Sequence, residues 1–459
     1  MPLHLLAVDG LGLGLLLVAA AGLSVLACAL RRVAEAGGGY KAKVLASGVF
    51  VSGRRWQDLL AADVKLDDYF ILRFFRASLD PARKRVTVRA LGLFHPRTAV
   101  HRPGLGCALA AGCPPRLSGP AEVPAGDGKP GPWETLPTPP EVERLVTAAF
   151  GEPNPAKLRR TRAVLVVEDG KLLAEAYAPG ITAEMPLCGW SMSKSVLALL
   201  VGAAQGRGFL KTSDSALLPE WSGPGDPRGT LTLEDLLRMR SGLAFDETYA
   251  NPLSDVTQTL FALPDSGGAA AAKPLEKAPG TEWRYASGTS NIVSRVLRRA
   301  LERAGEDYHR FPRAALFGPL GMGTALFETD AAGTFVGSSF VYAAARDWAR
   351  LGQLLLQDGV WEGRRVLPEG WVKFLSTPTP QSPNGCYGAH WWTKVAREMG
   401  GESPAALAVP ADAFHAFGHE AQCVSVIPSR KLVVVRLGLS VKVDAWNHAE
   451  FLEALLKLT

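Results

Sequence analysis

The stretch that most constrains this chain runs from Gly189 to Val201, where a Ser-x-x-Lys sequence leads directly into six apolar residues. A continuous apolar run of this kind predicts a helix buried in the protein interior. Residues three apart lie on one face of a helix, so the side chains of Ser191 and Lys194 are expected to be neighbours. The pattern therefore places a lysine at the start of a buried helix, where lysine is rarely found without a partner.

A serine and a lysine in this arrangement can form a nucleophile and its base. A serine hydroxyl is a weak nucleophile at neutral pH, and a lysine whose pKa is lowered by burial can remove its proton. The helix start also offers free backbone N–H groups to a developing oxyanion. The alternative is a surface helix that carries the two residues by chance. Against it, this is the only Ser-x-x-Lys in the chain.

The charge pattern does not favour nucleic-acid binding. The 459 residues carry a net charge of +6, but Lys and Arg are scattered among acids rather than gathered in a block. The sequence has neither a Cys-x-x-Cys nor a P-loop, and His415 and His419 lack the adjacent Glu of zinc peptidases. We therefore expect no cofactor, no metal and no nucleic-acid partner.

Residues 1–36 are predicted to be a transmembrane or signal-anchor segment. Leu11 to Leu30 has no charged residue, and a helix of this length spans about 30 Å, the thickness of a bilayer core. Two alternatives remain, because Ala27-Cys28-Ala29 resembles a signal-peptide cleavage site and Val25 to Cys28 loosely matches a lipoprotein box. Four cations follow the span: Arg31, Arg32, Lys41 and Lys43. By the positive-inside rule they favour a cytoplasmic location for the rest of the protein.

The rest of the chain divides into three parts. Residues 37–113 form an accessory β-rich segment, with strands expected at 46–51 and 85–90, and residues 114–140 form a Pro/Gly-rich linker or surface strap. The main domain covers 141–459. Cys107 and Cys113 are close enough in sequence for a small disulfide, with reduced thiols as the alternative.

Strand signals stand at both ends of the main domain. Residues 163–167 and 172–177 flank an Asp169-Gly170 turn and predict a hairpin, and 423–427 and 432–437 predict two strands near the C-terminus. Mostly helical segments lie between them, and a final helix is expected at 445–458. The fold class is therefore α+β, with one antiparallel sheet built from both ends of the domain and a helical domain inserted between them.

A Ser-Lys pair needs a second group that handles the proton of the leaving group, and a tyrosine held near a cation suits this task. Tyr249-Ala250-Asn251 and Tyr285-Ala286-Ser287 are the candidates. We choose Tyr285 because a tight turn precedes it and a helix follows, which would position the phenol. Tyr249 is interpreted as a loop tyrosine.

The stretch from Phe417 to Gln422 leads directly into a predicted strand. A strand edge beside the nucleophile can supply a backbone N–H as a second oxyanion donor. A basic side chain there, His419, could hold a substrate carboxylate or orient the tyrosine, although a structural histidine is the alternative.

At these residues the chain resembles the serine β-lactamase-related family, which includes class C β-lactamases, penicillin-binding peptidases, family VIII esterases and 6-aminohexanoate-dimer hydrolases. The resemblance covers about residue 150 to the end. It rests on Ser191-Met192-Ser193-Lys194, on Pro279-Gly280-Thr281 with Tyr285-Ala286-Ser287, and on Gly418-His419 through Gln422. The Tyr-x-Ser variant is most similar to the 6-aminohexanoate-hydrolase branch.

The resemblance implies a β-lactamase/transpeptidase-like fold, a mixed sheet with a helical domain and the site between them. It implies that Ser191 attacks a carbonyl, that Lys194 and Tyr285 move the proton, and that the N–H groups of Ser191 and Gln422 bind the oxyanion. Ser287 and His419 would complete the substrate site. Members of the family are commonly secreted or membrane-tethered outside the cytoplasm. The resemblance therefore favours a membrane-anchored enzyme in the periplasm or elsewhere outside the cytoplasm, and we prefer this placement to the cytoplasmic one that the positive-inside rule favours.

Two departures from the family pattern bear on function. Ser287 replaces the Asn typical of β-lactamases, which weakens a β-lactam-hydrolysing role, and Ala421 stands where relatives often have Gly. The leading hypothesis is a serine hydrolase that cleaves a small-molecule or peptide-like amide or ester through an acyl-enzyme. The second hypothesis is a non-catalytic scaffold or sensor that keeps the fold and binds a peptide or cell-wall fragment.

Overall fold

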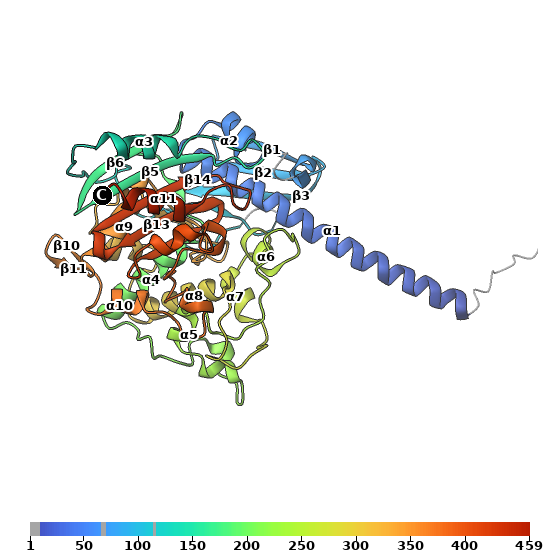
Figure 1. Ribbon diagram of the computed structural model, residues 1–459. Coiled ribbons are helices and arrows are strands. Elements are labelled where there is room, and N and C mark those ends of the chain that lie inside the picture. The colour runs from blue at the N-terminus through green and yellow to red at the C-terminus, as the bar shows by residue number, and fades with distance from the viewer. Residues whose placement is uncertain (1–9, 66–69, 113–115) are drawn as a thin grey trace, which may run out of the picture.

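The computed structural model describes residues 10–65, 70–112 and 116–459. A long helix, α1 (Gly10–Phe50), projects from a body made of two larger sheets, two smaller ones and a helical region (Figure 1). The central sheet has the order β12-β13-β14-β5-β6, and every neighbouring pair is antiparallel. Its strands are β5 (Thr161–Glu168), β6 (Lys171–Tyr177), β12 (Phe414–Gly418), β13 (Gln422–Ile427) and β14 (Leu432–Gly438).

The pairing of β14 with β5 joins the two ends of the main domain, which confirms the predicted fold class. The sheet is antiparallel throughout, so the mixed sheet implied by the resemblance is wrong for these five strands. The β5–β6 hairpin turns at Asp169 and Gly170, whose φ angles are +45° and +78°. Positive φ at both positions is what the Asp-Gly signal predicts.

Helices cover both faces of the central sheet. Helix α9 (Ala345–Leu356) packs on one face against β13, β14 and β5, and α3 (Pro140–Ala148) and α11 (His448–Leu456) pack on the other. Successive residues of β5 alternate between the two resulting cores: Leu165 faces one and Val166 the other. Burial on both faces explains why β5 reads as an unbroken apolar run.

The inserted helical region is built around α4 (Met192–Gly206), which is buried from Met192 to Ala204 and packs against α8 (Ser287–Arg303). The other helices of this region are α5 (Leu233–Leu237), α6 (Asp255–Phe261), α7 (Ser266–Ala271) and α10 (Trp371–Ser376). Short strands complete the domain: β7 (Leu187–Cys188), β8 (Leu326–Phe327), β9 (Val341–Ala343), β10 (Val360–Trp361) and β11 (Arg364–Arg365).

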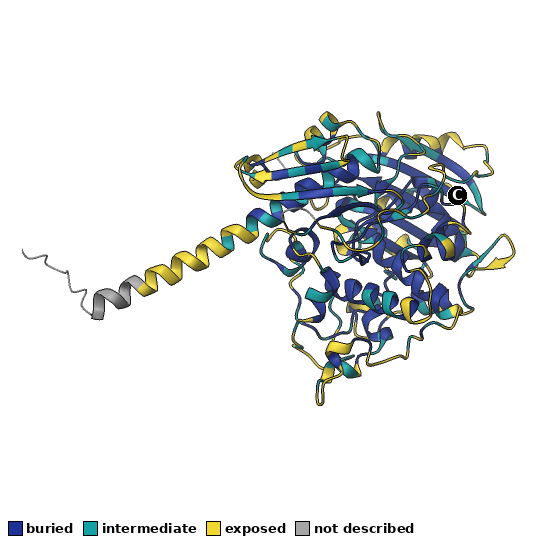
Figure 2. Cartoon of the chain, turned by 180° about the vertical axis from the view of Figure 1, so that it is seen from behind, coloured by how far each residue is buried: buried dark blue, intermediate teal, exposed yellow. Residues whose placement is uncertain are grey.

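Helix α1 has two halves in different surroundings (Figure 2). Residues 17–28 are exposed, whereas 34–50 are buried or half-buried in the body. The helix runs through residue 36 without a break and ends at Phe50, so the strand predicted at 46–51 is wrong. Packing overrides the local β-like composition there, because small residues such as Ala42 and Ala46 let the helix lie close to its neighbours.

The exposed half of α1 is long and apolar enough to cross a membrane. Within the part of the chain that the structure describes, it belongs to the one helix that meets this test, with a mean hydropathy of 1.7. By length and composition it suits either a membrane anchor or a signal sequence.

The accessory segment adds a four-stranded antiparallel sheet, on which the second half of α1 packs. Its elements are α2 (Trp56–Ala62), the 3-10 helix η1 (Phe70–Phe74), β1 (Phe75–Asp80), β2 (Arg85–Ala90), β3 (Phe94–Arg102) and β4 (Gly106–Leu109). The strand expected at 85–90 is confirmed as β2. Cys107 is buried in β4, whereas its proposed disulfide partner Cys113 lies outside the described residues.

The Pro/Gly-rich stretch before α3 lies along the main domain and is hydrogen-bonded to it. The N–H of Gly131 donates to the carbonyl of Gly321, and the indole of Trp133 donates to the carbonyl of Arg346 at 3.3 Å. Further on, the backbone N–H of Leu136 donates a hydrogen bond to the carbonyl of Leu172 in β6. These contacts hold the stretch as a strap on the surface.

A buried ion pair joins α1 to the main domain. Lys43 of α1 pairs with Glu328, and both side chains are almost fully buried. Ser47, one helical turn further, donates to the same carboxylate at 2.9 Å, and the N–H of Cys107 donates to it at 2.5 Å. The Lys43 amine also lies 4.2 Å from the ring centre of Phe340. A carboxylate held by three donors from two segments fixes the helix against the domain.

We predict that Lys43→Met lowers the free energy of unfolding by about 3–5 kcal/mol, because it leaves the Glu328 carboxylate buried without its cation. Thermal and urea unfolding of the full chain in detergent micelles measure this change. The matched control is Arg31→Met, which breaks the exposed Arg31–Glu35 pair on the same helix and should cost less than about 1 kcal/mol. Equal losses in the two variants would contradict the buried pair.

Candidate active site

The turn between β7 and α4 presents Ser191 at the start of the buried helix. Ser191 precedes Met192, the first residue of α4, and Trp190 before it has φ +47°. A left-handed conformation costs a tryptophan about 1–2 kcal/mol, so the surrounding contacts must hold it in place. The turn is anchored by Ser193, whose hydroxyl accepts a hydrogen bond from the N–H of Val341 at 2.8 Å.

Lys194 lies directly behind Ser191 and is 1% exposed. Its amine contacts three oxygens: the hydroxyl of Ser191 at 3.0 Å, the hydroxyl of Ser287 at 3.1 Å and the carbonyl of Ser338 at 3.1 Å. The amine also lies 4.8 Å from the ring centre of Tyr285. The structure therefore brings together around Lys194 four groups from the start of α4, the start of α8 and the segment before β9.

The three oxygens differ in what they can do. The carbonyl of Ser338 can only accept, and the Ser287 hydroxyl donates its own proton to Glu247 at 2.6 Å, so it too accepts from Lys194. A neutral lysine amine has two N–H bonds and one lone pair. In the charged amine a third N–H donates to the Ser191 hydroxyl. In the neutral amine, with both N–H bonds given to the other two oxygens, the lone pair is left for that hydroxyl, as a general base requires.

Burial sets the protonation states of this cluster. Desolvation lowers the pKa of Lys194 to about 8, and the negative charge of Glu247 opposes the shift. Burial, together with Glu247, raises the pKa of Tyr285, while its interaction with the Ser191 hydroxyl works in the other direction. At neutral pH the phenol is therefore protonated, and about one tenth of the amine is neutral.

Glu247 is the residue of this cluster that the sequence analysis missed. Its carboxylate accepts from the N–H of Ser287 at 2.8 Å, from the hydroxyl of Ser287 and from the hydroxyl of Tyr249 at 3.1 Å. These bonds hold Ser287 in place, so its hydroxyl oxygen faces Lys194 and can accept a hydrogen bond from the amine. The only sequence signal was its position two residues before Tyr249, a tyrosine interpreted as a loop residue.

The turn from Gly418 to Gln422 packs directly against the nucleophile turn. A side chain at 418 would overlap the carbonyl of Gly189, so the two backbones meet here. Glu420, with φ +62°, accepts a hydrogen bond from the indole of Trp190 at 2.9 Å, and burial raises the pKa of this carboxyl to about 7. Ala421 has φ +61°, a conformation that favours glycine.

His419 and Tyr249 meet face to face over the site. Their rings are 5.4 Å apart at an angle of 9°, and the edge of Trp190 contacts His419 from another side. Burial lowers the pKa of His419 to about 4, so its ring is neutral at physiological pH. It can offer an N–H or a lone pair to a substrate, but no charge.

Gln422 is placed differently from the other candidates. Its side chain donates to the carbonyl of Gly438 at 2.7 Å and accepts from the N–H of Gly438 at 2.8 Å. The side chain thus joins β13 to β14 and does not line the cleft, while the backbone at this position pairs with Gly418.

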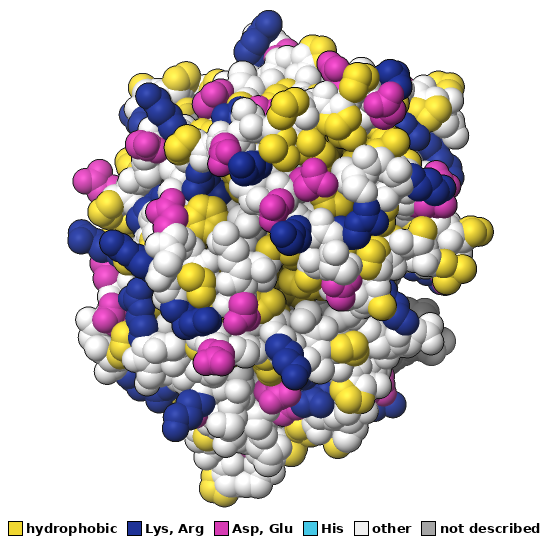
Figure 3. All heavy atoms as spheres, turned by 60° about the vertical axis from the view of Figure 1, so that its left-hand side comes forward, with side chains coloured by type: hydrophobic (Ala, Val, Ile, Leu, Met, Phe, Trp, Pro, Cys, Tyr) yellow, Lys and Arg dark blue, Asp and Glu magenta, His cyan; other side chains and the backbone are white. Residues whose placement is uncertain are grey.

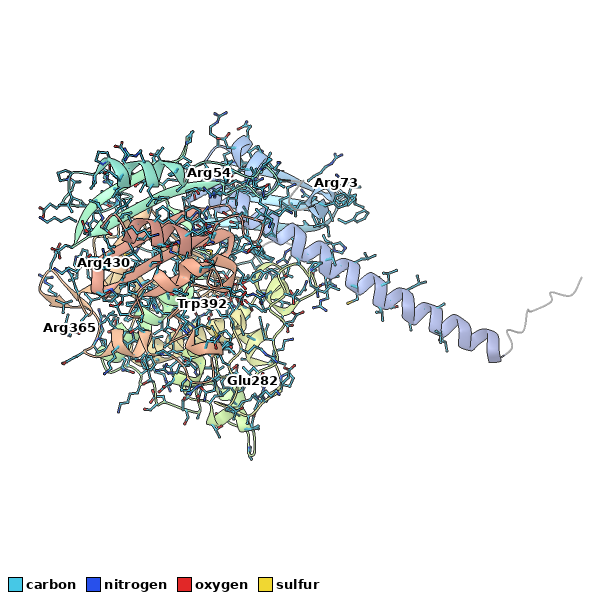
Figure 4. All side chains as sticks on the ribbon, in the orientation of Figure 1. Arg54, Arg73, Glu282, Arg365, Trp392 and Arg430 are labelled. Atoms are coloured by element: carbon cyan, nitrogen blue, oxygen red, sulfur yellow. The ribbon has the colours of Figure 1, made fainter. Side chains whose placement is uncertain are left out.

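The cleft in front of Ser191 has a volume of about 470 Å³. Ser191, Tyr285 and His419 line it, and Lys194 and Ser287 lie behind Ser191. Its walls are largely aromatic, with Trp283 and Trp392 beside Tyr285 and with Phe417 and Trp446 further along. Trp392 lies in the body between the central sheet and the helical region (Figure 4). Among the described residues, no group of three or more His, Cys, Asp or Glu is placed to hold a metal ion.

The family model named Beta-lactamase matches residues 148–442. The chain belongs to the beta-lactamase family. The match covers most of the main domain, including the Ser191 helix, Tyr285 and the 418–422 turn, and classes the chain among serine hydrolases. The family resemblance predicted from the motifs is therefore confirmed.

Known proteins support the same assignment. Over 266 residues the chain is 27% identical to the 6-aminohexanoate-dimer hydrolase of Paenarthrobacter ureafaciens, an alignment that covers 50% of this chain and 64% of the relative. A Bacillus anthracis structure provisionally named as a 6-aminohexanoate-dimer hydrolase matches with a TM-score of 0.59 and 18% identity over 73% of this chain and 88% of that one. A penicillin-binding protein homologue from Caulobacter crescentus matches with a TM-score of 0.52 and 15% identity over 71% and 99%. The two structures show the shared fold.

We predict that Gly418→Ala destabilises the protein by about 1–3 kcal/mol, because the new methyl group forces the 418–422 turn away from Gly189. The matched control is Gly223→Ala, since a methyl group there meets no atom within 4 Å. Melting temperatures of the two variants and the parent chain measure the difference. An unchanged melting temperature in Gly418→Ala would show that the two turns are not in close contact.

Proposed function

We propose that this chain is a serine hydrolase that cleaves an amide or ester bond through an acyl-enzyme on Ser191. The observation that carries the proposal is the arrangement around Lys194: its buried amine lies 3.0 Å from the Ser191 hydroxyl and 3.1 Å from both the Ser287 hydroxyl and the Ser338 carbonyl. When the amine is neutral, the last two oxygens can accept both of its N–H bonds, which leaves its lone pair for Ser191. The catalytic unit is the main domain, residues 141–459, with 37–113 as an accessory segment.

Acylation begins when the Ser191 oxygen attacks the substrate carbonyl carbon and its proton moves to the Lys194 amine. The bond to the leaving group then breaks, and Tyr285 gives its phenolic proton to the departing nitrogen or oxygen. The Lys194 ammonium returns a proton to the phenolate, so both groups recover their starting states. Water then attacks the acyl carbonyl and releases the acid, with the same groups acting in reverse.

The oxyanion formed in both steps needs donors. Following the family pattern, we assign this role to the backbone N–H groups of Ser191 and Gln422. The close contact of Gly418 with Gly189 and the bond between Glu420 and Trp190 support the assignment, because they hold the two donor-bearing turns together. Ser287 positions Lys194, and His419 contacts the substrate as a neutral group.

The cleft supports a substrate with an apolar part that packs on its aromatic walls. A relative named for the hydrolysis of a linear amide favours amides, and Ser287 in place of Asn makes β-lactams poor substrates. We place the enzyme at a membrane, anchored by α1 and facing outside the cytoplasm. Parallel assays with p-nitrophenyl esters, nitrocefin, D-amino-acid peptides and aminohexanoate oligomers separate these substrate classes.

We predict that a fluorophosphonate probe labels Ser191 and that Ser191→Ala abolishes both labelling and turnover, because the probe reacts with an activated serine. Intact-protein and peptide mass spectrometry locate the label. The matched control, Ser222→Ala, removes an exposed serine and should leave labelling unchanged. A folded protein that binds peptides or cell-wall fragments without ever being labelled would instead identify a scaffold or sensor.

We predict that kcat/KM for an ester substrate rises about tenfold per pH unit below pH 8 and levels off above it, because Lys194 must be neutral to act as a base. Glu247→Gln should move the inflection to lower pH. The carboxylate favours the charged amine, so its removal lowers the pKa of Lys194 further. A pH series of kcat/KM for both proteins measures the shift.

The control for this shift is Glu398→Gln, which removes another carboxylate from the cleft lining without touching Ser287. Its inflection should stay at the parent position. If both variants move the inflection equally, the shift comes from the general charge of the cleft and not from the Glu247 carboxylate in particular.

A further inference from the structure

An apolar surface lies at the end of the accessory sheet, away from the catalytic cleft. Its members come from η1, from the turn between β2 and β3 and from the first residue of β3. The N–H of Leu91 in the turn donates to the carbonyl of Phe74 in η1 and joins the two segments. We call this surface the apolar collar, and its exposed residues are Phe70, Ile71, Phe74, Leu91, Leu93 and Phe94. Leu93 is 75% exposed. Soluble surfaces rarely gather so many large apolar side chains without a partner.

The collar faces the side on which α1 leaves the body. Arg73 of η1 lies on that side, whereas Arg365 and Arg430 lie on the opposite side (Figure 4). Figure 2 shows the same end of the small sheet exposed beside the emerging helix. In contrast, the face turned away from α1 carries charged side chains of both signs scattered among small apolar areas (Figure 3).

Contacts between α1 and β3 show which part of α1 lies beside the collar. Gly38 packs against Arg97 of β3, and Arg31, His95 and Pro96 line one groove beside the helix. From Arg97 to Phe94 the strand advances about 10 Å, and from Gly38 to Arg31 the helix advances about the same. The collar therefore lies level with the point where the exposed apolar half of α1 begins.

Arginines border the collar. Arg73 lies over the ring of Phe70, with its guanidinium 3.9 Å from the ring centre. Arg76 and Arg89 are exposed and directly opposite each other in the β1–β2 pair. Like charges in directly opposed positions repel, and an anion between them relieves the repulsion. Apolar side chains flanked by arginines suit the boundary between acyl chains and anionic headgroups.

We propose that the collar docks on the membrane that α1 crosses, with its apolar side chains in the headgroup region and Arg76 and Arg89 on lipid phosphates. The proposal rests on α1 acting as a membrane anchor. The occupant is the lipid bilayer itself, because the collar is continuous with the exposed apolar half of α1 and lies at the level where that half leaves the body.

The test uses the full chain in vesicles, with an environment-sensitive fluorophore on a single introduced cysteine. The background carries Cys28→Ser, Cys113→Ser and Cys386→Ser, and the same background without an introduced cysteine measures any labelling of the remaining native thiols. Leu93→Cys reports on the collar, Leu23→Cys on the exposed half of α1, and Leu458→Cys, near the C-terminus on the far side, is the matched control. Labelling of Ser191 by a fluorophosphonate verifies that each variant is folded.

In vesicles of phosphatidylcholine and phosphatidylglycerol, we expect the label at Leu93 to shift to the blue. Lipids with a nitroxide near the headgroup should quench it several-fold more than the label at Leu458. Quenching at Leu23 without quenching at Leu93 would overturn the collar and leave the anchor standing. No quenching at either position would overturn both.

The arginine contribution is tested separately by adding Arg76→Gln/Arg89→Gln to the Leu93→Cys chain. Quenching should fall in the anionic vesicles and stay unchanged in phosphatidylcholine alone, since only the former offers extra negative charge. Equal quenching in both lipids, with and without the arginines, would overturn the headgroup contact.

Discussion

The proposed active site depends on the burial of one lysine. Lys194 is placed by a helix that is apolar on all sides, and its desolvation keeps a fraction of the amine neutral at physiological pH. The cost of burying the amine is offset by three oxygen partners, two of which accept its N–H bonds. The remaining partner is the Ser191 hydroxyl, so the same contacts that stabilise the buried amine also direct its lone pair.

The accessory segment contacts the site through buried polar groups. The carboxylate of Asp63, which follows α2, accepts two hydrogen bonds of 2.7 Å. One comes from Arg54 of the accessory segment and the other from Arg162 of the main domain. These residues, with Glu420 and Trp190, border a small enclosed space between α1 and the nucleophile turn. The accessory segment thus borders the same space as Trp190, the residue before Ser191.

Local patterns predicted what local geometry controls. The Ser191–Lys194 contact follows from the spacing of one helix, and the hairpin follows from its Asp-Gly turn. Glu247 could not be predicted, because its partner Ser287 is 40 residues away and the two meet only through the fold. The strand expected at 46–51 failed for a similar reason, since burial against distant segments decides its conformation. Tyr249 was passed over because stacking on His419 leaves no sequence signal.

The unbroken course of α1 has a mechanical meaning. Many anchored enzymes hang from a flexible tether, but here one continuous helix enters the body and is fixed there by the Lys43–Glu328 pair. Because the helix is continuous, its outer half and the body move as one rigid unit. If the outer half lies in a bilayer, a change in its tilt relative to the membrane normal turns the whole body by the same angle. The tilt of the helix then sets the distance and angle of the cleft mouth to the lipid surface.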